Sequence, residues 1–475
     1  MSSRPLVIWW IRRDLRLTDN PALTAALEDS RAVLPVYILD EQDEALGAAP
    51  KFRLGLGLEH FGRELAKAGS RLILRRGSAL EVLKDLIAET GAGAVHWSRL
   101  YDPQAIARDT SVKQQLKAEG IEARSFGGRL LFEPWTVGTK AGGMFKVFTP
   151  FWKAVRVRAV DRLLPAPARL PVPERWPASN DLTTWNMAAA MRRGADVAAR
   201  YCRVGEAAAR DRLGAFLANT VVSYQDRRDF PGEDVTSGLS ENLAWGEISP
   251  HRLWHMGRAA MESSSRGAET FLKELVWREF AYHLMYHSPH ILTRSWRPEW
   301  AAFPWAEGNT PQLQAWQRGQ TGYDFIDAAM RELYVTGKMH NRARMITASF
   351  LTKHLMMHWK TGMDWFAETL VDWDPAANAM GWQWVAGSGP DAAPFFRIFN
   401  PSSQLEKFDP SGNYVNRWIA ECQARPPRTA RDFFEAAPRA WKLRPDMPRA
   451  TPVISLQAGR ERALAAYHSL RQKER

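Results

Sequence analysis

Four short apolar runs, separated by stretches long enough for a helix, most constrain how this chain can fold. Each run is nearly continuous in branched and aromatic residues, as in strands buried on both faces of a parallel sheet. Helical patterns at 51–67 and 79–89 lie between runs, so strand and helix alternate as in βαβ units. We therefore predict a doubly wound, Rossmann-like α/β domain over residues 1–130. The four runs are LVIWWI (6–11), AVLPVYIL (32–39), RLILR (71–75) and AVHWS (94–98).

The glycine fingerprint of dinucleotide-binding domains is missing from this region. GLGLEH (55–60) follows no predicted strand and has His60 where the third glycine belongs. The segment after the first run, IRRDLRLTDN, contains no glycine. This pattern argues against a nicotinamide-dependent dehydrogenase.

Two further regions with different sequence patterns follow the α/β region. Residues 160–185 are rich in proline and are typical of a surface linker. From about residue 195 the pattern is almost entirely helical and ends in an amphipathic helix, RERALAAYHSLRQKER (460–475). We predict a linker over 131–199 and an all-α domain over 200–475.

Composition narrows the class of function. A net charge of +12 favours an acidic partner such as nucleic acid. Two cysteines are too few for a disulfide scaffold or a Cys₄ metal site. No apolar run reaches the roughly 20 residues of a membrane span, and the N-terminus lacks a signal-peptide core. We therefore expect a monomeric cytoplasmic protein with no membrane partner.

One stretch, DWDPAANAMGWQW (372–384), combines two carboxylates, an amide and three indoles. Asp374 followed by Pro375 predicts a helix start, with the aspartate as N-cap and proline at the first helical position. Asn378 and Trp382 follow Asp374 at i+4 and i+8, so the three side chains share one helix face.

Other residues of the same stretch leave alternatives open. Trp384 lies about 200° round the helix from Trp382 and should face a different neighbour. Gly381 would let a neighbouring group approach closely. Asp372 and Asp374 have the spacing of a DxD metal motif, but two acids are weak evidence, and we predict no metal. A capped, tryptophan-rich core helix would explain the stretch without any ligand.

Two further segments place aromatic, charged and amide side chains on one helix face. In KELVWREF (273–280), Glu274, Trp277 and Arg278 lie at i, i+3 and i+4, which suits a flat polar ligand and a phosphate. In KMHNRARMITASF (338–350) a second such face forms, and Arg342 points elsewhere. Salt-bridged structural helices would give the same patterns. The second face comprises Asn341, Arg344, Met345 and Ala348.

These segments, with others in the same order along nearly the whole chain, resemble the photolyase/cryptochrome family. The resemblance is to the bacterial cyclobutane pyrimidine dimer photolyases in particular. It implies an N-terminal α/β domain, a long linker and a helical domain that binds FAD in a U-shaped conformation. The matching segments are WWIRRDLRLTDNPAL, RDFPGEDVTSGLS, KELVWREF, GQTGYDFIDAAMRELYVTGKMHNRARMITASFL, DWDPAANAMGWQW and FRIFNPSSQLEKFD.

The resemblance implies a set of FAD-binding residues. The TSGLS run matches the family's phosphate-binding segment, and two arginines match residues beside the flavin ring that would stabilise its anionic reduced form. The two acids of the DxD pair match acceptors for the ring and ribose, and Asn378 matches the residue facing flavin N5. The implied FAD residues are Tyr224, Thr236, Ser237, Gly238, Leu239, Ser240, Arg278, Arg344, Asp372, Trp373, Asp374 and Asn378.

The resemblance also implies DNA containing a cyclobutane pyrimidine dimer as the partner. The dimer would be flipped out of the duplex into a pocket, at a cost of a few kcal/mol that is lowest for a damaged base pair. Glu274 and Asn378 are the implied catalytic residues. The pocket residues would be Glu274, Trp277, Asn341, Met345 and Trp384, and residues along the DNA strand would be Arg228, Arg342 and Gln404.

The implied reaction is light-driven: excited reduced FAD donates an electron to the dimer, the cyclobutane ring opens, and the electron returns. Trp382, Trp359 and Trp305 match the family's chain of electron carriers, with Trp300 as a rival for the last position.

Family members often carry a second, light-harvesting chromophore. The segment SRLYDPQAIARD (98–109) departs from one folate-binding subgroup and is more similar to another. We expect methenyltetrahydrofolate rather than a deazaflavin or FMN.

Three other functions remain as alternatives. A cryptochrome would share the fold and signal without repair, but it usually has a replaced asparagine at the N5 position, and Asn378 is present here. A (6-4) photolyase would have histidines where this chain reads MHNRARM. A basic, tryptophan-rich nucleic-acid-binding protein would carry no flavin and would not absorb blue light.

Overall fold

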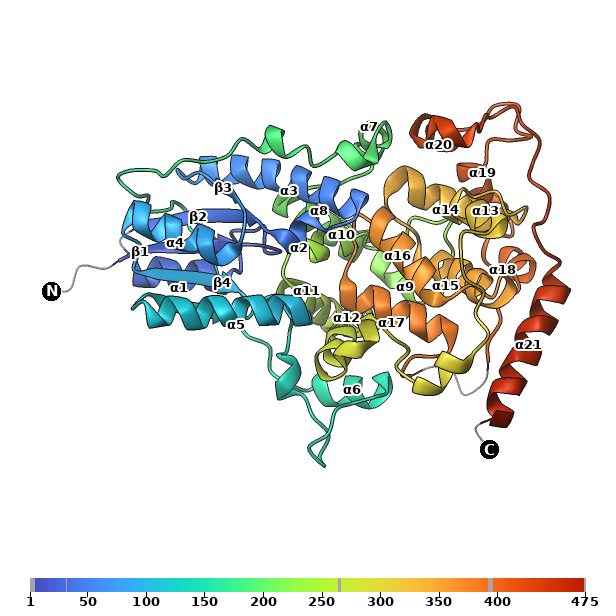
Figure 1. Ribbon diagram of the computed structural model, residues 1–475, viewed down its shortest axis with the longest axis horizontal. Helices are drawn as coiled ribbons and strands as arrows, with labels where there is room; N and C mark the ends of the chain where they lie inside the picture. The colour runs from blue at the N-terminus through green and yellow to red at the C-terminus, as the bar shows by residue number, and fades with distance from the viewer. Residues whose placement is uncertain (1–4, 31, 264–265, 392–395, 474–475) are drawn as a thin grey trace.

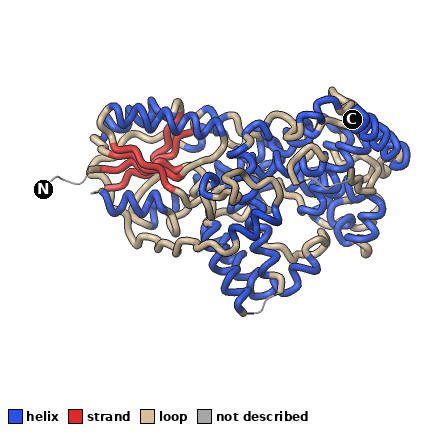
Figure 2. Tube along the Cα trace, turned by 90° about the horizontal axis from the view of Figure 1, so that it is seen from below, coloured by secondary structure: helices blue, strands red, loops and turns tan. Residues whose placement is uncertain are grey.

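The α/β part of the molecule is a five-stranded parallel sheet with helices on both faces (Figures 1 and 2). The computed structural model describes residues 5–30, 32–263, 266–391 and 396–473. The strand order is β3-β2-β1-β4-β5, which confirms the predicted doubly wound class. The elements are β1 (Leu6–Ile11), α1 (Pro21–Asp29), β2 (Ala32–Leu39), α2 (Glu41–Glu44), α3 (Ala48–Lys67), β3 (Ile73–Arg76), α4 (Ala79–Thr90), β4 (Ala94–Ser98), α5 (Pro103–Ala118) and β5 (Glu122–Phe126).

Strand β1 lies at the centre and is buried along its whole length. Its alternate residues enter two cores: Val7, Trp9 and Ile11 on one face, and Leu6, Ile8 and Trp10 on the other. Two-sided burial explains why the strand sequence is continuously apolar.

The linker folds back along the α/β part before the helices begin. Backbone N–H groups of Leu170 and Asn180 donate to the carbonyls of Ala68 and Leu74, so the linker is held on the surface of the sheet domain. Its short elements are η1 (Pro134–Thr136), α6 (Phe148–Val155), η2 (Leu182–Trp185), η3 (Ala189–Met191) and α7 (Gly194–Ala199).

The remaining described residues form a helical assembly with two large apolar cores (Figure 1). This confirms the predicted all-α part. Its elements are α8 (Glu206–Ala215), a π-helical turn η4 (Phe216–Thr220), α9 (Val221–Arg227), α10 (Ser240–Ala244), α11 (Pro250–Glu262), α12 (Ala268–His287), η5 (Pro289–Leu292), η6 (Pro298–Ala302), α13 (Pro311–Gln317), α14 (Asp324–Thr336), α15 (Asn341–Ser349), a π-helical turn η7 (Phe350–His354), α16 (Trp359–Thr369), α17 (Pro375–Ala386), α18 (Pro401–Phe408), α19 (Asn413–Trp418), α20 (Arg428–Ala436), η8 (Arg439–Trp441) and α21 (Leu456–Lys473).

Several predicted boundaries were wrong by a few residues. The third strand begins at Ile73, not residue 71, and the helix predicted over 51–67 begins at Ala48. The C-terminal helix begins at Leu456, and the last two residues of the predicted helix, 474–475, lie outside the described part of the chain. Strand β5 was not predicted, because only Ala123 of its five residues is buried and it lacks an apolar run.

Candidate functional site

Helix α17 carries the stretch that the sequence singled out. Asp374 is its N-cap and accepts a hydrogen bond from the Ala377 N–H at 3.0 Å, with Pro375 at the first helical position, so the predicted helix start is confirmed. The Asn378 side chain donates to the Met363 carbonyl at 2.9 Å, which fixes the amide against α16.

Trp382, one turn beyond Asn378, is 2% exposed and packs against Phe366, with ring centroids 4.9 Å apart. The close approach expected at Gly381 occurs instead at Gly362 on α16, where an added Cβ would lie 2.0 Å from the Trp382 ring. Gly381 faces open space, because it lies about 100° round the helix from the side that packs on α16. Trp384 faces a different neighbour, as predicted, and its indole N–H donates to the Asp391 carbonyl at 2.9 Å.

Asp374 also belongs to a buried polar triad. The Tyr282 hydroxyl donates to Asp374 Oδ2 at 2.5 Å, and Arg129 reaches both groups. Burial alone would raise the pKa of Asp374, but the charges of Arg129 and Arg278 outweigh it and lower that pKa, so the acid stays ionised. Burial raises the pKa of Tyr282 to about 12, which keeps the phenol protonated as a donor.

Of the residues predicted near the flavin, Asp372 and Arg278 each have a buried polar atom without a hydrogen-bond partner in the described part of the chain. Arg344 Nη2 is 2.8 Å from Asp372 Oδ2, while Asp372 Oδ1 is buried and has no partner. Arg278 donates from Nη1 to the Arg129 carbonyl at 2.9 Å, and its Nη2 is buried without a partner. A buried carboxylate oxygen and a buried guanidinium nitrogen left in this state can each hydrogen-bond to a polar ligand.

Next to Arg278, Glu279 joins the helical part to the start of the linker. Its carboxylate is 3% exposed and accepts from the Leu131 and Phe132 N–H groups at 2.8 and 3.3 Å. Burial raises the pKa of this carboxyl to about 7, from an ordinary value of 4.5.

A raised carboxyl pKa makes the folded state bind a proton that the unfolded state has released. The stabilisation of the folded state by this proton on Glu279 is complete below the pKa of the unfolded chain, and it is lost as the pH rises through about 7. Glu279→Gln keeps the acceptor for both N–H groups without the charge. Relative to the wild type, the variant should therefore gain up to about 3 kcal/mol in free energy of unfolding between about pH 5 and pH 8. Urea unfolding of both proteins at the two pH values measures this gain, and an equal difference at both would contradict it.

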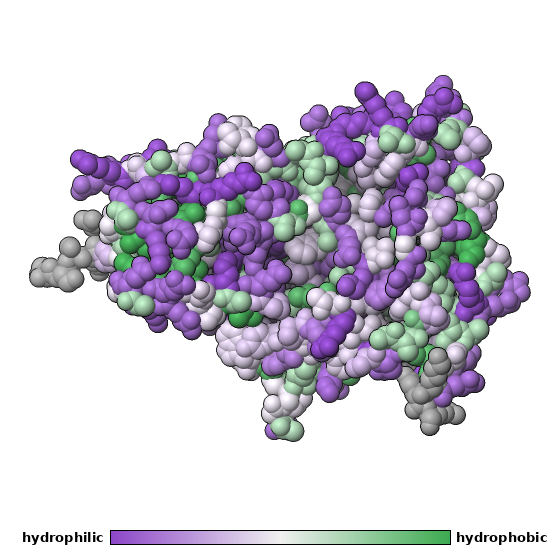
Figure 3. Space-filling model, viewed as in Figure 1, coloured by the Kyte–Doolittle hydropathy of each residue, from purple (hydrophilic) through white to green (hydrophobic). Residues whose placement is uncertain are grey.

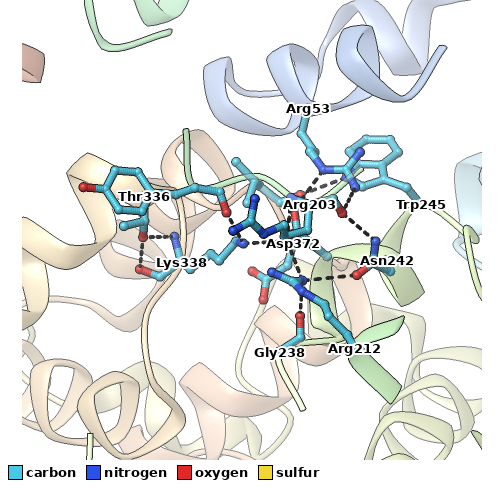
Figure 4. Close-up of polar contacts among 12 residues, drawn as sticks. Arg53, Arg203, Arg212, Gly238, Asn242, Trp245, Thr336, Lys338 and Asp372 are labelled. Atoms are coloured by element: carbon cyan, nitrogen blue, oxygen red, sulfur yellow. Dashed lines mark hydrogen bonds and ion pairs between the residues drawn. The ribbon is translucent and has the colours of Figure 1, made fainter. Parts of the chain in front are cut away.

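The predicted phosphate-binding run, Thr236 to Ser240, adjoins a buried ionic cluster, to which Figure 4 shows Gly238 joined through Arg212. Gly238 adopts a left-handed conformation (φ 61°), and its carbonyl accepts from Arg212 at 2.6 Å. The buried Glu241 carboxylate, directly after the run, pairs with three cations that sequence reasoning missed: Arg53 at 3.0 Å, Arg212 at 2.7 Å and Lys338 at 2.5 Å.

This cluster ties the sheet domain to the helical part, because Arg53 belongs to α3 and also pairs with Glu247. Burial opposes ionisation of Glu241, but Lys338 and Arg53 outweigh it and lower its pKa. The three cations face two acids, Glu241 and Glu247, which leaves one net positive charge beside the exposed Thr236, Gly238 and Ser240. An anionic group would be attracted to this surface.

The predicted dimer-pocket residues lie on α12, α15 and α17, and α12 and α15 both pack on α17. Glu274 forms an ion pair with Arg228, whose guanidinium lies 5.4 Å from the Tyr224 ring centroid. Trp277 is stacked on Phe148 of the linker helix α6, with centroids 3.7 Å apart and planes 6° apart. Phe148 therefore occupies one face of this indole, a contact that the sequence did not reveal.

Two of the three residues predicted to follow the DNA strand, Arg342 and Gln404, line a smaller surface cavity of 360 Å³, whereas Arg228 does not line it. Arg342 pairs with Asp229 and lies 4.5 Å from the Phe408 ring centroid, pointing away from Arg344 as predicted. Lys407 also lines the cavity. Asn341 is exposed at the start of α15, and Met345 is half-buried one turn later.

The three predicted electron carriers lie on α16, α17 and the segment after η6. Trp359 is fully buried, with its indole N–H bonded to Ser295 Oγ at 3.2 Å, and shares a face of α16 with Gly362. His358 lies between Trp359 and Trp305, at 5.3 and 5.4 Å from their ring centroids. Trp305 is half-buried, whereas its rival Trp300 is only 4% exposed. Of the two, Trp305 is the one that a solvent reductant can reach.

A larger cavity of 980 Å³ lies between the sheet and the helices. The segments that follow β1, β2 and β4 line it, which places it at the carboxyl ends of the strands, where the strand order reverses. Trp373, Pro375 and Asn378 line the opposite side. Within the described residues we find no group of three or more His, Cys, Asp or Glu side chains placed to hold a metal ion. No helix in that part of the chain is long and apolar enough to cross a membrane.

Comparison with known proteins gives a consistent result along the chain. Residues 7–173 match the family model of DNA photolyase, and residues 271–469 match that of the FAD binding domain of DNA photolyase. The deoxyribodipyrimidine photo-lyase of Agrobacterium fabrum is 43% identical, over 99% of both chains.

Two solved structures are also similar. A class III photolyase from Agrobacterium tumefaciens is 42% identical with a TM-score of 0.91, covering 99% of this chain and 98% of that one. An archaeal photolyase from Sulfolobus tokodaii with two FAD molecules is 29% identical with a TM-score of 0.79, covering 98% and 100%. The chain belongs to the DNA photolyase family.

Proposed function

We propose that this protein is a light-dependent deoxyribodipyrimidine photo-lyase that splits cyclobutane pyrimidine dimers in DNA. The observation that carries the proposal is the placement of cofactor-type and lesion-type residues on three packed helices, α12, α15 and α17. We also propose the division into residues 1–130, 131–199 and 200–475. We expect the enzyme to act as a monomer in the cytoplasm.

The residues present fit FAD. Asp372 Oδ1 and Arg278 Nη2 are buried polar atoms that need partners, and Gly381 leaves space beside α17. The exposed hydroxyls of Thr236 and Ser240 adjoin the cationic cluster around Glu241, where a diphosphate would be attracted. When bound and reduced, FAD would supply the photoexcited electron that opens the cyclobutane ring.

The chain's own residues would bind and orient the reactants. Asp372 and Asp374 would accept hydrogen bonds from ring and ribose donors, and Arg344 pairs with Asp372. Asn378, held by the Met363 carbonyl, would present its amide oxygen toward flavin N5.

On the substrate side, Trp277 and Trp384 would form aromatic walls for the flipped dimer, and Glu274 and Asn341 would contact the pyrimidine edges. Glu274 is pre-positioned by its ion pair with Arg228. Arg228, Arg342 and Gln404 would contact the DNA strand without reading its sequence.

The tryptophans would keep the cofactor in its active state. Trp382, Trp359 and Trp305 extend from the buried α16–α17 contact to a half-exposed position, which gives a path to an external reductant. We propose Trp305, not Trp300, as the terminal donor because of its greater exposure.

The part of the 980 Å³ cavity beside the sheet, opposite the FAD-assigned residues Trp373 and Asn378, is the proposed site of a light-harvesting chromophore. Its size suits a ligand of folate dimensions, and Arg12 and Arg108 lie over the Trp10 ring at 4.5 and 5.1 Å. We propose methenyltetrahydrofolate, and mass spectrometry of chromophores released from the purified protein would distinguish it from a deazaflavin, FMN or a second FAD.

Repair of a dimer-containing oligonucleotide tests the function directly. Under blue light the reduced protein should restore the two pyrimidines, and the same mixture in darkness should not. Binding of the lesion without repair in light would contradict the proposal and favour a cryptochrome-type signalling role.

A further inference from the structure

A cationic cleft of 430 Å³ lies on the outside of the helical part, formed by the start of α7, the end of α20 and the segment after it. None of its lining residues belongs to α9, α12, α15, α17 or α18, which carry the proposed lesion-binding residues. Figure 3 shows hydrophilic side chains covering this region, at the upper right over α7 and α20. The lining residues are Arg193, Phe434, Ala437, Pro438, Arg439, Lys442, Leu443, Arg444 and Met447.

The charge of the cleft is largely unneutralised. Four of the lining residues are cations and none is an acid. Among the described residues, only Arg444 of the four has an ion pair, with Asp446 at 3.2 Å, and both side chains are 72% exposed. Two exposed cations of the sheet domain differ, because Arg63 and Lys67 both pair with nearby carboxylates.

The cations are held in place by packing around them. Arg193 Nε donates to the Ala437 carbonyl at 2.7 Å, and a second nitrogen donates to the Phe434 carbonyl. Trp441, next to Lys442, packs on Tyr334 with ring centroids 4.8 Å apart. The segment that carries the cations is therefore anchored to α14 and does not need to be ordered by a ligand.

Backbone conformation gives an independent indication. Lys442 and Arg192, the neighbour of Arg193, have φ values of 54° and 52°, in the left-handed region that long side chains rarely adopt. Such conformations persist where the surroundings impose them, and they gather at functional sites.

We propose that this cleft binds phosphate groups of DNA outside the lesion pocket. Cations around an apolar floor of Phe434, Leu443 and Met447 suit a sugar-phosphate backbone. Exposed Arg431 on α20, which has no ion pair among the described residues, extends the positive surface beyond the cleft, so it suits a repeating anion better than a single phosphate. The proposed repair function supplies DNA as the partner, and the cleft would add affinity for duplex flanking the lesion.

The test compares duplex lengths. Arg439→Ala, Lys442→Ala and Arg444→Ala are combined in one variant, and binding is measured by fluorescence anisotropy over a series of salt concentrations. For an undamaged duplex of about 40 base pairs, the slope of log affinity against log salt should fall by up to about 3, roughly one per lost phosphate contact. For a dimer-containing duplex of about 12 base pairs, affinity and the rate of light-dependent repair should not change.

A matched variant controls for net charge. Lys117, Arg169 and Arg175 are exposed cations of the sheet domain and linker, and replacing these three with alanine removes the same charge. Its slope for the long duplex should remain close to that of the wild type. Equal slopes for wild type and the cleft variant, or equal losses in both triple variants, would overturn the proposal. Saturable binding of inorganic phosphate by the wild type but not by the cleft variant, together with equal salt slopes for the long duplex in both proteins, would show a free-phosphate site instead. Because binding to undamaged DNA is read in darkness, failure of the cleft proposal is separable from failure of repair.

Discussion

Trp382→Phe should abolish efficient photoreduction of the flavin while leaving the repair step close to the wild-type rate. The indole is 2% exposed between Phe366 and Gly362, so no solvent donor can replace it at that position. Phenylalanine is much harder to oxidise, and it preserves an apolar shape at a packing cost of about 2 kcal/mol. Folding and flavin binding should therefore survive, and only the supply of electrons from outside should fail.

Flavin absorbance during illumination with an external reductant measures this loss, and single-turnover repair after dithionite reduction measures what remains. Trp316→Phe is the matched control, because Trp316 is equally buried and lies 6.2 Å from Trp382 on a side not assigned to the chain. Normal photoreduction in Trp382→Phe with loss in Trp316→Phe would place the electron path through Trp316. Loss of repair in the pre-reduced Trp382 variant would mean that this residue holds substrate or flavin.

Local features of the structure were predictable from sequence because their causes are local. The start of α17 depends on Asp374 and Pro375, two adjacent residues with well-defined capping roles. The buried strands β1 and β2 are recognisable in the sequence as continuous apolar runs. Edge strand β5, exposed and mixed in composition, has no comparable signature.

The partners of the site residues could not be predicted in the same way. Arg129 and Asp374 are 245 positions apart in the sequence, yet both contact Tyr282. The sequence around any one of these residues does not indicate which residues will be its partners. The role of Arg53 could not be predicted either, because only the folded chain brings this helical residue to Glu241. Sequence reveals which residues need partners, but the packing of the sheet on the helices decides which partners they find.

Trp277→Ala should remove most of the preference for damaged DNA. Phe148 already covers one face of the indole at 3.7 Å, so the flipped dimer can use only the other face, and Phe148 holds the ring rigid for that contact. Loss of one stacking partner costs about 1–3 kcal/mol, or roughly 5- to 150-fold in affinity for the dimer. Undamaged duplex flips no base into the pocket, so its affinity should hardly change.

Arg342→Ala should have a different effect, and the contrast between the two variants locates the pocket. Arg342 lines the surface cavity beside Gln404 and Lys407 and would contact phosphate, which is present in damaged and undamaged DNA alike. Its loss should weaken binding to damaged and undamaged duplexes by a similar factor, and it should lower the slope of log affinity against log salt by about one. That reduction will be smaller if Arg342 stays with Asp229 in the complex, since a guanidinium already paired with a carboxylate releases fewer counterions on meeting DNA. Competition binding of the two duplexes at fixed salt gives the discrimination ratio for each variant. An unchanged ratio in Trp277→Ala would place the dimer elsewhere, because an indole stacked on the lesion cannot be removed without altering that ratio.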